Sequence, residues 1–145
     1  MSNRIPSRIK IDNSKFHLFQ EIKQKFPKAC YNSDVFALAV AYGYDAGLKV
    51  PIESKRDYIN AVSISDELNS VMLLIALADF GDEVNQLINN PSLMFELAEE
   101  YANGGIDLFY DDFRNCGGDF ANHLAEKLIY LNDEFDFKKQ LNEVL

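Results

Sequence analysis

The chain has 145 residues, of which 48% are hydrophobic, and a formal net charge of −9. This length and hydrophobic content allow one domain with a real core and exclude wholesale disorder. The negative charge argues against a protein that coats nucleic acid over its whole surface. The longest apolar run, residues 71–78, is too short to span a membrane, and two distant cysteines without a targeting segment predict a cytoplasmic protein.

The charge is unevenly distributed along the chain. Residues 1–28 hold seven Lys or Arg against two acidic residues, a net charge of +5. Residues 29–60 hold three basic and four acidic residues, and residues 61–145 hold four basic and seventeen acidic residues, a net charge of −13. The sequence therefore predicts a single domain, residues 1–145, with a basic head (1–60) and an acidic helical body (61–145).

The basic head begins with a predicted strand. Residues 8–12, RIKID, alternate polar and apolar side chains as a β-strand does. The two isoleucines are expected to face the interior and the three charged residues the solvent. A helix is expected to follow as far as residue 25, with N-cap oxygens offered by residues 12–14. The next helix is expected to be capped by Asn32 or Ser33.

This second helix contains an unusual stripe of small residues. Ala39, Gly43 and Gly47 recur every four residues, so they line one helix face. A glycine inside a helix costs roughly 1 kcal/mol relative to alanine, so a close backbone contact is expected to compensate. That contact is either packing within the chain or an oligomer interface with a second copy in a homodimer. Gly47 has a further alternative role as the C-terminal cap of the helix.

The rest of the chain is predicted to form mainly helices. Pro51 ends any helix before it, and at most a small extended hairpin is expected near residues 49–64. Gly104 is expected to end one helix before another begins. The fold class is therefore mainly α, with a short N-terminal strand plus helices in ribbon-helix-helix order, followed by a compact helical bundle. Ser65 is expected to cap the first helix of the body. Helices of the body are expected over residues 66–80, 82–89, 91–103, 105–116, 119–131 and 133–145.

Catalytic signatures are missing from the sequence. His17 and His123 lack metal-ligand spacing, and no Walker loop, GxSxG or HExxH motif occurs. We therefore expect no catalytic residue, no metal and no cofactor. A metal-dependent hydrolase built on carboxylates is the alternative, but solvated helix faces, or an acidic docking surface for a basic partner, explain these residues better. The carboxylates in question are Glu96, Glu99, Glu100, Asp107, Asp111 and Asp112.

The basic N-terminus predicts a binding surface for double-stranded DNA. In ribbon-helix-helix proteins two chains pair their strands and lay the ribbon in the major groove. The N-terminus of the second helix is then free to hold a backbone phosphate. A solvated basic face or a protein-docking face is the alternative. The residues expected to contact DNA are Arg8, Lys10, Lys15, Lys28 and Ser33.

Three stretches of the chain resemble a known family. They are SDVFALAVAYGYDAGLKVPIESK, VMLLIALADFGD and FELAEEYANGGIDLFYDDF. Together they resemble the bacterial Dnd system-associated (DNA phosphorothioation-associated) proteins of the fourth type. The resemblance covers roughly residues 33–112 and is fainter at residues 8–22.

This resemblance implies a genetic setting rather than an activity. It places the chain beside enzymes that replace a backbone phosphate oxygen by sulfur, or beside linked restriction proteins that act against phage. It implies no catalytic residues. We therefore expect a non-catalytic accessory protein that binds DNA or other subunits of such a system. The alternative is an acidic adaptor, or a nucleic-acid mimic that inhibits a basic partner.

Overall fold

Helices dominate the part of the chain that the structure, a computed structural model, describes, residues 8–25 and 31–115. This confirms the mainly α class. The chain divides into two compact units, Met1–Tyr110 and Asp111–Leu145, and the elements below belong to the first, apart from the last five residues of α5. The elements are β1 (Arg8–Asp12), α1 (Phe16–Lys25), α2 (Asn32–Ala46), β2 (Lys55–Asn60), α3 (Asp66–Phe80), α4 (Val84–Asn89) and α5 (Ser92–Asn115).

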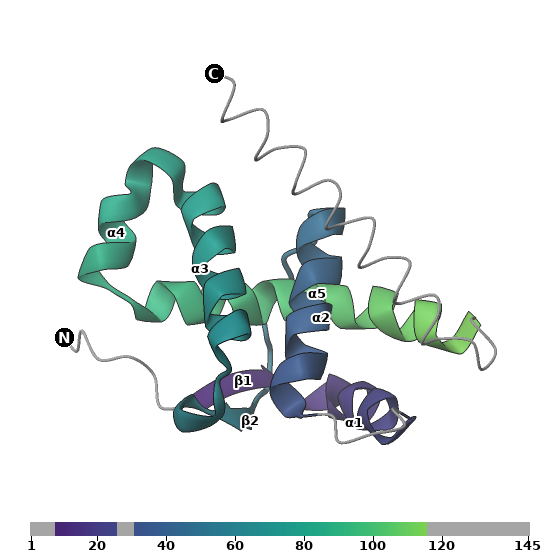
Figure 1. Ribbon diagram of the computed structural model, residues 1–145. Helices are drawn as coiled ribbons and strands as arrows, with labels where there is room; N and C mark the ends of the chain where they lie inside the picture. Colours follow the sequence, from purple (N-terminus) through teal and green to yellow (C-terminus); the bar gives the residue numbers. More distant parts are fainter. Residues whose placement is uncertain (1–7, 26–30, 116–145) are drawn as a thin grey trace. The chain divides into compact units, whose positions relative to one another are not determined.

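Within the first unit, α5 lies across α2 and α3, which stand side by side (Figure 1). The strands β1 and β2 lie with α1 near the N-terminal ends of α2 and α3. Short 3₁₀ turns, Asn13–Lys15, Ala61–Ser63 and Gly81–Glu83, precede α1, α3 and α4. The basic head and the acidic body that the charges delimit therefore share one packed unit as far as Tyr110.

The predicted strand at residues 8–12 is present, and its partner lies in the same chain. β1 pairs antiparallel with β2, with Ile9 opposite Ile59 and an irregularity between Ile9 and Lys10. Where at most a small extended hairpin was expected, residues 49–64 contain one strand, β2, which pairs with β1 rather than with a second strand of that segment. Ile9 and Ile11 are buried, as the alternation predicts. The expectation that Asp12 faces solvent is wrong, because its carboxylate turns inward and accepts backbone hydrogen bonds.

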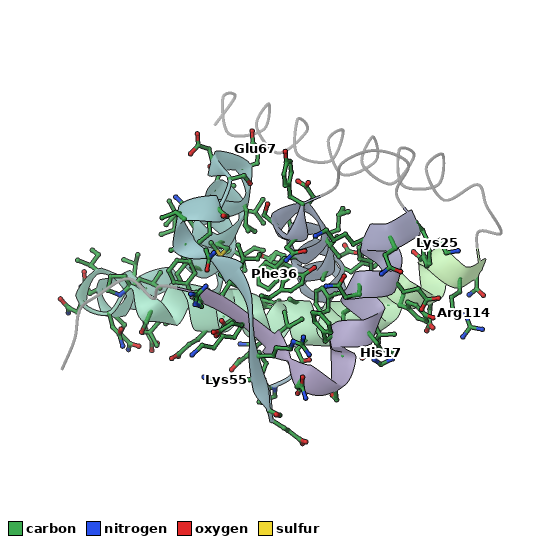
Figure 2. All side chains as sticks on the ribbon, turned by 90° about the horizontal axis from the view of Figure 1, so that it is seen from below. His17, Lys25, Phe36, Lys55, Glu67 and Arg114 are labelled. Atoms are coloured by element: carbon green, nitrogen blue, oxygen red, sulfur yellow. The ribbon has the colours of Figure 1, made fainter. Side chains whose placement is uncertain are left out.

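Aromatic and β-branched side chains form the core between the strands and helices. Phe36 of α2 lies at the centre of these side chains in Figure 2, and it is fully buried. The rings of Tyr42 and Phe109 stack with centroids 5.0 Å apart, which joins α2 to α5. Phe19 of α1 tilts against Tyr58 of β2 at 5.1 Å. The largest fully buried side chains are Phe19, Phe36, Phe109, Ile9, Ile22, Leu68, Met72, Ile106, Val35 and Val40.

The helix boundaries follow the capping residues closely. The hydroxyl of Ser65 accepts a hydrogen bond from the Leu68 N–H at 3.1 Å, so the predicted cap of α3 is confirmed. Gly47 ends α2 with φ of 68°, the left-handed conformation that glycine adopts easily. The N-cap of α2 is Tyr31, one residue before the expected position. Its N–H donates to the Asp34 carboxylate at 2.9 Å.

The expected break at Gly104 does not occur, because α5 runs without interruption through Gly104 and Gly105. Both glycines lie where another backbone comes close. A Cβ on Gly105 would overlap the carbonyl oxygen of Ala39, and one on Gly104 would overlap that of Leu48. The pair therefore serves helix packing, and the prediction that it terminates a helix is wrong.

The small-residue stripe of α2 meets these glycines within the same chain. Ala39 and Gly43 are buried, and a Cβ on Gly43 would overlap the carbonyl oxygen of Tyr101. Of the two roles that the sequence leaves open, the structure shows the intramolecular one at these positions. Gly47 has open space around it and serves as the C-terminal cap.

Because α2 and α5 approach closely, the direction in which a glycine substitution changes the stability tests their packing. Gly105→Ala adds a methyl group that the Ala39 carbonyl blocks, and such overpacking typically costs about 1–3 kcal/mol. An unobstructed helical glycine would instead gain roughly 1 kcal/mol from alanine. We expect urea denaturation to show a loss of at least about 2 kcal/mol for Gly105→Ala. Gly47→Asn, at an open left-handed position, is the control and should change stability by less than about 1 kcal/mol. A more stable Gly105→Ala would contradict the packing.

Candidate functional site

The polar residues that organise the first unit lie along one face of α5. Glu99, Asn103 and Asp107 are spaced four residues apart, so they share that face. We call these three residues the α5 polar stripe. Each holds a different part of the chain. Glu99 contacts β1, Asn103 contacts the segment before β2, and Asp107 contacts the turn before α1.

Glu99 closes the free edge of β1. Its Oε2 accepts a hydrogen bond from the Lys10 N–H at 2.6 Å, on the edge that β2 does not occupy. The residue is only 7% exposed. Burial raises the pKa of this carboxyl to about 7, against the hydrogen bond from Lys10 and the charges of Lys55 and Lys10, which lower it. Glu99 therefore changes charge near neutral pH.

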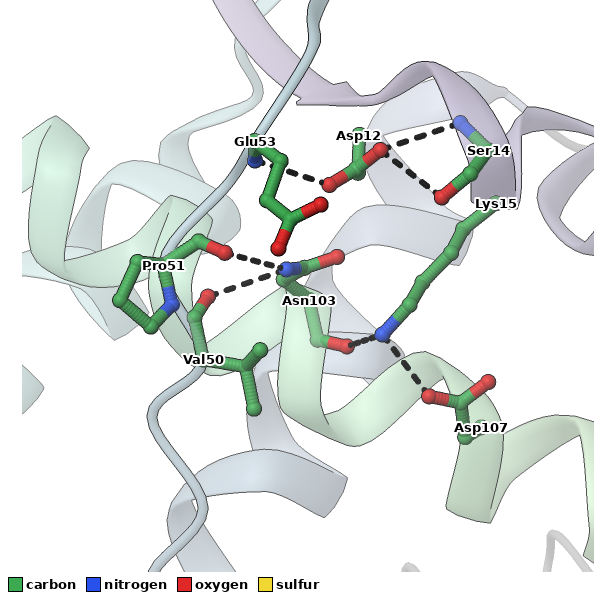
Figure 3. Close-up of polar contacts among 8 residues, drawn as sticks. All are labelled: Asp12, Ser14, Lys15, Val50, Pro51, Glu53, Asn103 and Asp107. Carbon is green, nitrogen blue, oxygen red and sulfur yellow. Dashed lines mark hydrogen bonds and ion pairs between the residues drawn. The ribbon is translucent and has the colours of Figure 1, made fainter.

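Asn103 holds the segment that leads from α2 to β2 (Figure 3). Its Nδ2 donates to the Val50 carbonyl at 3.0 Å and to the Pro51 carbonyl at 3.1 Å. Its buried Oδ1 accepts no hydrogen bond from the residues that the structure describes. The two donor contacts fix the side-chain amide orientation, because a flipped amide would turn an acceptor toward two carbonyl oxygens.

Asp12 fastens the same segment from the other side. Its Oδ2 accepts the Glu53 N–H at 3.0 Å, and its Oδ1 accepts both the N–H and the hydroxyl of Ser14 at 3.1 and 2.8 Å. The hydrogen bond from Glu53 is the largest of the contacts that lower the pKa of Asp12. The carboxylate that was expected at the surface thus joins β1 to the segment that leads to β2.

Lys15, a predicted DNA contact, is directed to α5 instead. Its Nζ donates to the Asn103 carbonyl at 2.6 Å and to the Asp107 carboxylate at 2.8 Å, and its side chain is 20% exposed. Figure 3 shows the lysine reaching both groups. A hydrogen bond from a charged donor to a partly buried carbonyl contributes about 1.5–3 kcal/mol. Lys15 therefore has a structural role at this junction.

Arg8 and Lys10 lie together on β1, as predicted, with Arg8 exposed and Lys10 partly exposed. The Nε of Arg8 lies 3.5 Å from the Asp57 carboxylate on β2. Asp57 also stands opposite Lys10 in the strand register. Part of the positive charge of this strand is therefore balanced within the hairpin.

Two further basic residues lie on the neighbouring strand β2, and the sequence reasoning missed them. Lys55 and Arg56 are exposed at the start of the strand, where Figure 2 shows Lys55. The guanidinium of Arg56 stacks 3.4 Å from the Phe16 ring centroid and donates to the Asn13 side chain at 3.2 Å. The sequence does contain a signal for a strand that carries them, because the charged run ESKRD directly precedes an apolar pair. We call Arg8, Lys10, Lys55 and Arg56 the basic hairpin.

Ser33 lies in the first turn of α2, beside the C-terminal end of β2. It is buried and lines a pocket of about 240 Å³. The Asn32 side chain donates there to the Tyr58 carbonyl at 3.0 Å, which ties the start of α2 to β2. Lys28 lies outside the described residues. The pocket is lined by Lys23, Tyr31, Asn32, Ser33, Tyr58, Ile59, Asn60 and Ser63.

The described part of the acidic body spreads its carboxylates in several directions. Glu99 faces β1 and Asp107 faces Lys15. Within residues 8–25 and 31–115, no three His, Cys, Asp or Glu side chains converge as metal ligands would. None of the helices in these same ranges is long and apolar enough to cross a membrane.

The fold and these contacts define a small helical protein in which a two-stranded hairpin is fastened to the long helix α5. The family model described as DNA sulphur modification system-associated protein 4 matches residues 8–143. The chain belongs to this family, which confirms the resemblance seen in the sequence and extends it beyond residues 33–112. No curated protein and no solved structure gives a significant match.

The buried Glu99 carboxyl predicts an unusual dependence of stability on pH. Its pKa is about 7 in the folded protein against an ordinary value of 4.5, so the folded state binds the proton more tightly. Stability should therefore fall as the pH rises from about 4.5 to about 7, by up to about 3 kcal/mol. Glu99→Gln keeps an acceptor for the Lys10 N–H and should remove this fall.

Urea denaturation across this pH range measures the effect. The glutamine variant should exceed the wild type in stability at pH 8, and Glu67→Gln, on the exposed start of α3, should retain the wild-type profile. Because Asp12 has a lowered pKa, its contribution changes at lower pH, outside this window. Identical profiles for Glu99→Gln and wild type would show that the carboxyl does not titrate as described.

Proposed function

We propose that the chain is a non-catalytic accessory protein of a DNA phosphorothioation-linked antiphage system, and that it acts by binding other proteins of that system. Membership of the DNA sulphur modification system-associated family is the observation that carries the proposal. It supplies the setting, because a protein associated with a multi-protein modification system is expected to contact other subunits.

The use of the polar residues supports a binding role over a catalytic one. Asp12 and Lys15 each join two segments of the chain, and Glu99 closes the edge of a strand. A catalytic acid or base needs a proton-transfer partner in a substrate within hydrogen-bond reach. The contacts of these three groups are instead with the protein's own backbone and side chains, which is the pattern of a scaffold.

Co-expression tests the proposal. The tagged chain is produced together with the sulphur modification proteins encoded beside its gene, and the mixture is analysed by size-exclusion chromatography with light scattering. The proposal predicts that the chain elutes at the mass of a complex with at least one of them. An unrelated acidic protein with the same tag should elute alone. A chain that elutes alone from every such mixture would contradict the proposed function.

A second candidate function, contact with double-stranded DNA, is favoured by the exposed basic hairpin. Arg8, Lys55 and Arg56 are exposed on two adjacent strands, and Lys10 is partly exposed between them. Asp57 and the negative charge of the whole chain oppose the attraction. Binding by this surface alone should therefore be weak, and strengthened when a basic subunit offsets the acidic charge.

Fluorescence anisotropy over a salt series, on plain and phosphorothioate duplexes, tests this candidate. Each phosphate contact contributes about 0.9 to the slope of log affinity against log salt concentration. Arg8→Glu/Lys10→Glu should lower both the affinity and the slope. Lys25→Glu/Arg114→Glu changes the net charge equally at exposed positions that do not belong to the basic hairpin and should have a smaller effect. Equal losses for the two double variants would exclude the hairpin as the contact.

A further inference from the structure

Helix α3 carries apolar side chains on two opposite faces. Leu68, Met72 and Ile75 are buried against the rest of the unit. On the outward side, Leu73 is 47% exposed, Leu74 is 53% exposed and Leu77 is 42% exposed. Positions three and four residues apart are neighbours on a helix surface, so these three leucines form one patch. We call Leu73, Leu74 and Leu77 the α3 leucine face.

Leucines grouped in this way call for an explanation. Single apolar residues are common on protein surfaces, whereas contiguous apolar groups with polar surroundings mark interaction sites. The next helix, α4, exposes a further large apolar side chain, Ile88, which is 72% exposed. A separate apolar face of α3, Leu68, Met72 and Ile75, is buried, so the outward leucines are not needed to fill the core.

The charged residues that flank the α3 leucine face in the sequence are all acidic, and the lysine that reaches α3 from elsewhere, Lys49, is paired with Asp79 at 3.5 Å. The helix begins with Asp66 and Glu67, and Asp82 and Glu83 follow its end; all four are exposed. The sequence contains no Lys, Arg or His between Arg56 and Arg114. The leucines therefore lie between two acidic groups, in a stretch of sequence without positive charge.

This charge selects among the three possible occupants of the face. A second copy of the chain would bring the same acidic groups against one another. The chain's own residues 116–145 hold six acidic and three basic residues, so their net charge has the same sign. A partner with apolar side chains flanked by Lys or Arg satisfies both the leucines and the carboxylates.

We propose that the α3 leucine face docks an amphipathic helix of a partner protein, one that carries leucine-like side chains on one face and basic residues at its borders. Laying an apolar helix face on a complementary apolar surface is an established mode of peptide recognition. The inference rests on the proposed function, because it identifies the surface through which the accessory protein contacts another subunit.

A designed peptide tests the chemistry of this face without a known partner. The probe is a labelled synthetic helix of about five turns (roughly 18 residues), with leucines on one face and lysines at its borders. A second peptide has glutamate in place of each lysine. Fluorescence anisotropy with the full chain should detect binding of the lysine peptide, weaker at high salt, and little binding of the glutamate peptide. Equal binding of the two peptides, or binding of neither, would overturn the proposal.

Substitutions locate the contact. Leu74→Gln/Leu77→Gln leaves the net charge unchanged. It should lower the affinity for the lysine peptide by at least about tenfold, since central apolar anchors contribute most of the energy of an interface. Val62→Gln, at a side chain that is 94% exposed before α3, is the matched control and should leave the affinity unchanged. Circular dichroism must show that both variants are folded. An unchanged affinity for the folded double variant would overturn the proposal.

Three further outcomes distinguish this inference from a dimer interface and from the proposed function. If the wild type is a dimer in light scattering and the double variant is a monomer, the face belongs to a second copy and the docking proposal is overturned. If co-expression yields a complex that the double variant forms equally well, the accessory role stands and the contact lies elsewhere. If no complex forms but the lysine peptide binds through the leucines, the face docks such a helix while the proposed function fails.

Discussion

The backbone contact between α2 and α5 is the constraint on which the rest of the described structure depends. Gly43 and Gly105 leave no side chain between the two helices, so that the carbonyl oxygens of Ala39 and Tyr101 occupy the space. Gly104 admits the backbone of Leu48 in the same way. This contact sets the position of α5 relative to α2, and with it the position of every side chain that α5 presents.

The α5 polar stripe depends on that placement. Glu99 reaches the free edge of β1, Asn103 reaches the carbonyl groups before β2, and Asp107 reaches Lys15. Three successive turns of one helix thus hold β1, the segment before β2 and the turn before α1. Among the described residues, the surfaces that we propose for recognition are the basic hairpin and the α3 leucine face. The two surfaces differ in chemistry, since one offers positive charge and the other offers leucines between carboxylates.

Local patterns in the sequence predicted the elements well and their partners poorly. The alternation in residues 8–12 and the cap at Ser65 depend on neighbours in sequence, and both are found as expected. The Gly104–Gly105 pair has the appearance of a helix end, but its role depends on the distant residues Ala39 and Leu48. The sequence likewise predicts Lys15 as a DNA contact, and nothing near it in the sequence shows that its side chain donates to Asn103 of α5. Long-range contacts of this kind leave no periodic signal in a single sequence.

A nuclear Overhauser measurement tests the central contact most directly. In a uniformly labelled sample, the α protons of Gly43 and Gly105 should give a strong cross-peak, because the two backbones touch. In a mixture of labelled and unlabelled chains, an isotope-filtered experiment should show no such peak, because the contact lies within one chain. A filtered cross-peak, which would place the glycines between two copies, would contradict the account, as would the absence of the peak from the uniformly labelled sample.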